Sequence, residues 1–151
     1  MSHVVAMNVF IKDLDAFGMA CLMLGGKFHR NQKTWKWWQK WERDYHQNDA
    51  AYKQGIKPED YGKCEHAASF GTRMGYEVGL VKLPGKEGYQ LIFDFIDHEL
   101  TAKLGGQNAA ALIQQYGLAV AEKEVAELTF QGWTVEREMQ PNGDIQLKLV
   151  R

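Results

Sequence analysis

Residues 76–96 read YEVGLVKLPGKEGYQLIFDFI, and this stretch decides the fold class. Two apolar runs, 76–83 and 89–96, flank the segment Pro84-Gly85-Lys86-Glu87-Gly88, whose residue types favour a tight connection. The stretch therefore predicts a β-hairpin. The second run is apolar on both of its faces, which indicates a strand inside a sheet. Its alternating faces are Tyr89, Leu91, Phe93 and Phe95 on one side, and Ile92, Asp94 and Ile96 on the other.

Before this hairpin, the chain predicts two further strands and a helix. Residues 4–11 form an apolar, β-branched run, and residues 66–70 also look like a strand. Asp13 can cap a helix in which apolar residues recur at intervals of three and four, and Gly25-Gly26 ends it. Those apolar residues are Leu14, Phe17, Cys21 and Leu24.

After the hairpin, the chain predicts a long helix from Asn108 to about Phe130, followed by a second hairpin. The helix carries two apolar stripes on nearly opposite sides, which implies burial between layers or a partner on its outer side. One stripe is Leu112, Ile113, Tyr116, Ala119, Val120, Ala126 and Phe130, and the other is Leu118, Ala121, Val125 and Leu128. The strands 134–139 and 145–150 flank Pro141-Asn142-Gly143-Asp144, a turn signal.

This element order predicts a single α+β domain over residues 1–151, with an irregular, Trp-rich insert at about 27–63. We expect a mainly antiparallel sheet with two principal helices packed on it and a C-terminal β-hairpin. The 45% hydrophobic and 25% charged residues are typical of a globular protein. The net charge of −1 provides no global attraction to nucleic acid or anionic lipid.

Residues 33–46 hold four of the five tryptophans together with four basic residues. Indoles among cations are typical of binding surfaces, so this block is the predicted binding site. Its members are Lys33, Trp35, Lys36, Trp37, Trp38, Lys40, Trp41, Arg43 and Tyr45. Residues 34–38 fit a strand, in which Trp35 and Trp37 share a face, and they also fit a helix. The alternative is that two or three of these indoles belong to the core.

A second candidate site surrounds Cys64-Glu65-His66, where a thiol, a carboxylate and an imidazole are neighbours. Cys64 and His66 could line a catalytic pocket with Asp94 and His98 if the fold brings these side chains together. One Cys-x-His pair falls short of the two ligand pairs typical of structural zinc, so we expect no metal and no cofactor. Asp94, if buried, needs a partner such as His66, Arg73 or a backbone amide.

Several segments resemble a protein family known as domain of unknown function 1257. They are Met1-Ser2-His3, Asp13-Leu14-Asp15-Ala16, residues 89–94, Gln115-Tyr116, and the ending 132–136 through 142–147. That family includes a hypothetical chloroplast reading frame, cyanobacterial homologues and copies in tailed phages. Residues 31–66 depart from the plastid pattern and resemble the phage-carried branch. The resemblance implies a fold and carries over no catalytic residues.

We therefore expect a non-enzymatic binding or inhibitor module, phage-encoded, that engages a host or phage protein through its Trp-rich insert. One alternative is a small enzyme or ligand-binding protein with the Cys/His/Asp pocket. Another is a binder of single-stranded nucleic acid through the aromatic and basic block. Two cysteines and the absence of a signal peptide or an apolar span predict a cytoplasmic protein, in the host cytoplasm if phage-encoded. The oligomeric state stays open.

Overall fold

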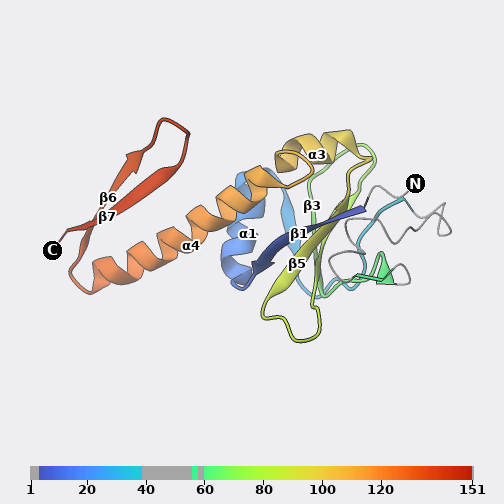
Figure 1. Cartoon of the computed structure of the whole chain (residues 1–151), viewed down its shortest axis with the longest axis horizontal. Coiled ribbons are helices and arrows are strands. Elements are labelled where there is room, and N and C mark those ends of the chain that lie inside the picture. Colours follow the sequence, from blue (N-terminus) through green and yellow to red (C-terminus); the bar gives the residue numbers. More distant parts are fainter. Residues whose placement is uncertain (1–3, 39–55, 58–59, 151) are drawn as a thin grey trace.

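The computed structural model describes residues 4–38, 56–57 and 60–150. Figure 1 shows a sheet with helices beside it and a separate hairpin beyond them. The strands of the sheet are β1 (Val4–Ile11), β2 (Lys27–His29), β3 (His66–Ser69), β4 (Glu77–Val81) and β5 (Tyr89–Asp94). The helices are α1 (Leu14–Met23), α3 (His98–Leu104) and α4 (Ala110–Phe130), and the hairpin strands are β6 (Thr134–Met139) and β7 (Ile145–Val150).

The five strands form an antiparallel sheet in the order β1-β5-β4-β3-β2. The α+β fold with a C-terminal hairpin is therefore confirmed. Strand β5 lies between β1 and β4, as the two apolar faces of its sequence predict, and Leu91, Ile92 and Phe93 are fully buried. Edge strand β1 is irregular between Ala6 and Phe10, where the side-chain amide of Gln90 donates to the Met7 carbonyl at 2.9 Å.

Side-chain alternation divides the core into two layers, one on each face of the sheet. On one face Leu80, Leu91 and Phe93 pack with Phe17 of α1 and Leu112 of α4. On the other face Ile92 packs with Trp35, Trp37 and Tyr61. The helices therefore cover one face, and part of the predicted insert covers the other.

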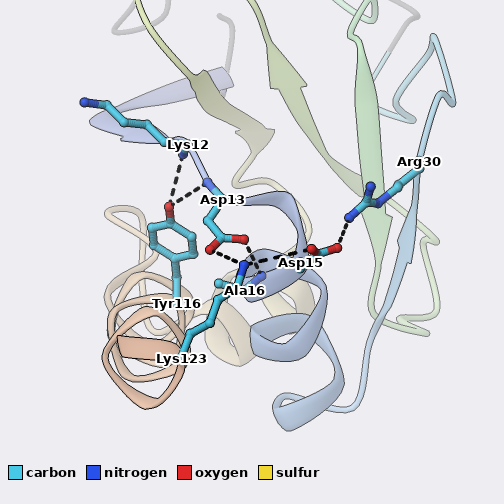
Figure 2. A network of polar contacts seen from close by, with 7 residues as sticks. All are labelled: Lys12, Asp13, Asp15, Ala16, Arg30, Tyr116 and Lys123. Carbon is cyan, nitrogen blue, oxygen red and sulfur yellow. Dashed lines mark hydrogen bonds and ion pairs between the residues drawn. The ribbon is translucent and has the colours of Figure 1, made fainter. Parts of the chain in front are cut away.

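Polar contacts at the start of α1 hold α1 against α4 (Figure 2). Asp13 caps α1 by accepting a hydrogen bond from the Ala16 amide at 3.0 Å, as its position predicts. The Tyr116 hydroxyl of α4 accepts hydrogen bonds from the backbone amides of Lys12 and Asp13, each at 3.1 Å. Lys123 Nζ lies 2.9 Å from Asp13 Oδ2, and this hydrogen bond lowers the pKa of the Asp13 carboxyl.

The two stripes of α4 face different neighbours. The first packs on α1 and the main core through Leu112, Ile113 and Tyr116, but its far end, Phe130, is 93% exposed. The second stripe borders the C-terminal hairpin, where Leu118 and Ala121 share a cleft with Ile145 and Leu147. In Figure 1 the hairpin returns from the end of α4 and forms a two-stranded sheet of its own.

Several predicted boundaries differ from the structure. The predicted strands 66–70, 76–83 and 89–96 end at Ser69, Val81 and Asp94, and α4 begins at Ala110. The insert predicted as irregular contains β2, a strand of three residues that is too short to show a period. Helix α3 was missed because Asp97-His98-Glu99 looks like a charged strand end. Asp97 is instead the helix cap, accepting hydrogen bonds from the Leu100 amide at 3.0 Å and the Thr72 hydroxyl at 2.6 Å.

Candidate functional site

The Trp-rich segment runs extended across the sheet face opposite the helices. The Trp35 amide donates to the Gly62 carbonyl at 3.0 Å, and Thr34 forms a β-bridge with Lys63. On its other side, the Lys36 amide donates to Glu77 Oε1 at 2.9 Å, and the Glu77 amide donates to the Lys36 carbonyl at 3.0 Å. Residues 34–38 therefore follow the extended alternative and not the helical one.

Two of the predicted binding indoles are core side chains. Trp35 is 1% exposed and Trp37 is 8% exposed. The Trp35 indole lies over Gly79 of β4, where an added Cβ would come within 2.5 Å of its ring. The Trp37 indole similarly lies against Gly62 and meets the Tyr61 ring edge-on, with centroids 5.5 Å apart. For these two indoles the core alternative describes the structure, because the neighbouring glycines make room for their rings.

The remaining members of the predicted block divide into three groups. Trp38 is half-buried, and its backbone amide donates to Asp94 Oδ2 at 3.0 Å. Lys33 and Lys36 are exposed, and Lys33 Nζ lies 3.0 Å from Glu65 Oε2. Lys40, Trp41, Arg43 and Tyr45 lie outside the described residues. In the described part of the block, the lysines and one edge of Trp38 are thus what a partner could reach.

The structure does not bring the predicted catalytic residues together. The ring of His66 meets Phe28 and Tyr89 on the helix-covered face, whereas Cys64 belongs to the tryptophan layer on the opposite face. Asp94 is two residues after Ile92 in β5, so its side chain lies on the same face of the sheet as Ile92, the face covered by Trp35 and Trp37. It is also separated from Tyr89 by five residues of strand, roughly 16 Å. His98 is an exposed residue at the start of α3. His66 lies on the face of the sheet opposite Cys64 and Asp94, and His98 is exposed at the start of α3, so the four side chains line no shared pocket.

Their local surroundings assign structural roles to three of them. Burial, with Glu77 nearby, raises the pKa of the Cys64 thiol to about 12, so the nucleophilic thiolate is scarce at neutral pH. His66 Nδ1 accepts a hydrogen bond from the Asn31 amide at 2.9 Å, and burial lowers the pKa of its imidazole. Asp94 is buried and accepts backbone amide bonds from Trp38 and Ile96, each at 3.0 Å, which confirms the backbone-amide partner among those predicted. Within the described residues, no group of three His, Cys, Asp or Glu side chains could hold a metal ion.

A groove of about 880 Å³ follows the side of β1 that has no strand neighbour in the described part of the chain. Val5, Met7 and Val9 of β1 and Ile113 of α4 form its apolar wall. Its polar rim is almost entirely amide side chains, with Asp144 as the charged member. The rim consists of Asn8, Gln107, Asn108, Gln114, Asn142 and Asp144. Three elements therefore build the groove: the sheet edge, the start of α4 and the turn of the C-terminal hairpin.

The hairpin turn is held over this groove by a contact with α4. The side-chain amide of Gln114 reaches the Gly143 carbonyl at 3.5 Å. Sequence reasoning missed the groove because its residues come from three separate segments. One signal was visible: Asn8 interrupts the apolar run of residues 4–11 at the irregularity of the strand. Irregularities of this kind are common in strands at the edge of a sheet.

No family model, curated protein or solved structure matches this chain. The resemblance to the domain of unknown function 1257 family therefore stays a prediction. Among the helices that the structure describes, none is both long and apolar enough to cross a membrane.

Proposed function

We propose that this protein is a non-enzymatic binding module that holds an extended segment of another protein along β1. The observation that supports the proposal is the groove, which combines an open strand edge with an apolar wall and an amide rim. An edge strand presents backbone N–H and C=O groups that an added strand can pair with. The Trp-rich insert, our first expectation for the contact surface, is supported less because Trp35 and Trp37 are buried.

The lining indicates the chemistry of the bound segment. Asn and Gln side chains both donate and accept hydrogen bonds, so they can satisfy a peptide backbone that enters without a charge. Val9, which is 38% exposed, and the half-buried Ile113 offer apolar contacts to side chains of an extended peptide, whereas Val5 and Met7 belong to the core beneath the groove. We therefore expect a largely uncharged segment with an apolar residue at every second position.

The decisive experiment compares two surface variants of matched exposure. Val9 lies in the groove and is 38% exposed, whereas Met74 lies on a loop outside it and is 41% exposed. Peptides selected from a displayed library on the wild-type protein should lose binding to Val9→Glu and keep binding to Met74→Glu. Their addition to the ¹⁵N-labelled protein should shift the amide resonances of residues 5–9. Selected peptides that bind Val9→Glu unchanged and shift resonances elsewhere would reject the groove as the binding site.

The nucleic-acid alternative requires exposed rings next to free cations. Trp35 and Trp37 are buried, and Lys33 is paired with Glu65, so the described part of the block lends it little support. A strong decrease of single-strand affinity with rising salt would favour it over the peptide groove.

A further inference from the structure

The C-terminal hairpin presents open strand edges that belong to no larger sheet. Strands β6 and β7 pair only with one another in the described chain, so each has one side without a strand neighbour. Two-stranded sheets are marginally stable by themselves and gain stability from additional strands. The hairpin packs on α4 along one face, yet Ile145 and Leu147 stay half-buried and Met139 is 75% exposed.

The two edges differ in charge. If β6 pairs antiparallel with the β6 strand of a second copy around a two-fold axis, two registers centre the strands. The first places Glu136 opposite Glu136 of the copy. The second places Arg137 opposite Arg137 and Glu136 opposite Glu138. Like charges that face each other across strands are destabilising. Strand β7, with the sequence IQLKLV, has one charged residue. When Leu147 pairs with Leu147 of the copy, Gln146 faces Lys148 and no like charges meet.

We propose that a second copy of this chain binds at the β7 edge, so that two hairpins form one four-stranded antiparallel sheet. The register centres on Leu147 because the neighbouring central register would place Lys148 opposite itself. The pairing is isologous, as expected for a two-fold dimer. The pairing extends the sheet face that carries Ile145 and Leu147. It leaves the groove along β1 free for the peptide segment of the proposed function.

Substitutions at Gln146 test the dimer, because each should change the stability of the single hairpin and the stability of the dimer in opposite directions. Within one chain Gln146 faces Glu138, and in the dimer it faces Lys148 of the second copy. Gln146→Glu should therefore weaken the hairpin of a single chain but strengthen the dimer through two new Glu–Lys pairs. Gln146→Lys should strengthen the single hairpin through Glu138 but weaken the dimer through two Lys–Lys contacts.

Sedimentation equilibrium from low micromolar to near-millimolar protein measures the dimer dissociation constant directly. Two cross-strand pairs change in each dimer, so we expect roughly a three- to tenfold lower constant for Gln146→Glu and a similar increase for Gln146→Lys. Urea melts at a concentration where the protein is monomeric should show the reverse order of stability. A chain that is monomeric throughout overturns the proposal, and so does a dimer whose constant responds equally to both variants.

Discussion

Leu91 and Leu147 occupy similar places in two antiparallel hairpins, yet Leu91 is fully buried and Leu147 is half-buried. Strand β5 has strands on both sides, helices over one face and the tryptophan layer over the other. Among the described residues, strand β7 has one strand neighbour, β6, and borders α4 at a cleft of about 340 Å³.

The difference shows that the pattern of apolar residues sets which side of a strand can be buried. The layers that pack against the strand set what fraction of that side is buried. The two strands are similar in apolar content, but β5 carries apolar residues on both faces, whereas β7 alternates Ile145 and Leu147 with Gln146 and Lys148. The faces of the sheet β1–β5 form a closed unit because both are covered, although the edge of β1 is open, whereas the C-terminal hairpin has only one face partly covered, by α4.

The largest expected effect tests this comparison directly. Leu91→Ala removes a side chain enclosed on all sides and should lower the free energy of unfolding by about 2–5 kcal/mol. Leu147→Ala removes the same atoms from a half-open site, so it should cost about 1 kcal/mol or less. Urea melts of both variants give the two values. Equal losses would show that the hairpin is packed as tightly as the sheet.

Asp94→Ala should lower the free energy of unfolding by about 1–3 kcal/mol, because it leaves the amides of Trp38 and Ile96 without their carboxylate acceptors. The matched control is Asp144→Ala, an exposed carboxylate in the turn of the C-terminal hairpin. Denaturation curves of Asp94→Ala that overlay those of the wild type would mean that the Trp-rich segment is not anchored to the sheet through Asp94.

A pair of glycine variants compares the closed unit with helix α4, which is only partly covered. Gly79→Ala adds a Cβ 2.5 Å from the Trp35 ring and should destabilise the protein by about 1–3 kcal/mol. Gly117→Ala adds a Cβ to α4 with no heavy atom within 4 Å, and should stabilise by about 0.5–1 kcal/mol through helix propensity. Melting temperatures should therefore move in opposite directions. A stabilising Gly79→Ala would place Trp35 away from β4.

The smallest effect is a pH dependence from His66 in the closed unit. Burial lowers the pKa of its imidazole below the ordinary value of 6.5, so the unfolded chain takes up a proton first as pH falls. The contribution to stability is complete above pH 6.5 and decreases as pH falls from there toward the lowered pKa. Urea melts of His66→Gln should show a shallower decrease over this window than the wild type. A slope of His66→Gln equal to that of the wild type would contradict this contribution.

Much of the fold could be predicted because its elements carry local signals. Asp13 is followed by an amphipathic segment, Gly25-Gly26 ends that helix, and the C-terminal hairpin occupies the predicted residues 134–139 and 145–150. The missed elements lack such signals. Strand β2 has three residues, and only Phe95 and Ile96 separate β5 from the α3 cap at Asp97, so their apolar side chains read as a continuation of the strand.

The candidate sites were harder to predict because function depends on which side of a layer a residue occupies. Cys64 and His66 are neighbours in sequence, yet the structure directs them to opposite faces of the sheet, as Cys64 precedes β3 and does not follow its alternation. The tryptophan cluster resembled a binding surface because a short segment gives no indication of the glycines that receive its rings.

The sequence by itself determined the class of the fold, the internal position of β5 and the helix ends at glycine, because these depend on periodicity and on local backbone chemistry. Tertiary structure alone decided that Trp35 and Trp37 seal the second face of the sheet and that His66 lies on the opposite face from Cys64 and Asp94. It also decided that the edge of β1, the start of α4 and the hairpin turn enclose one groove. Each of these outcomes depends on the packing of segments distant in sequence, which no local pattern encodes.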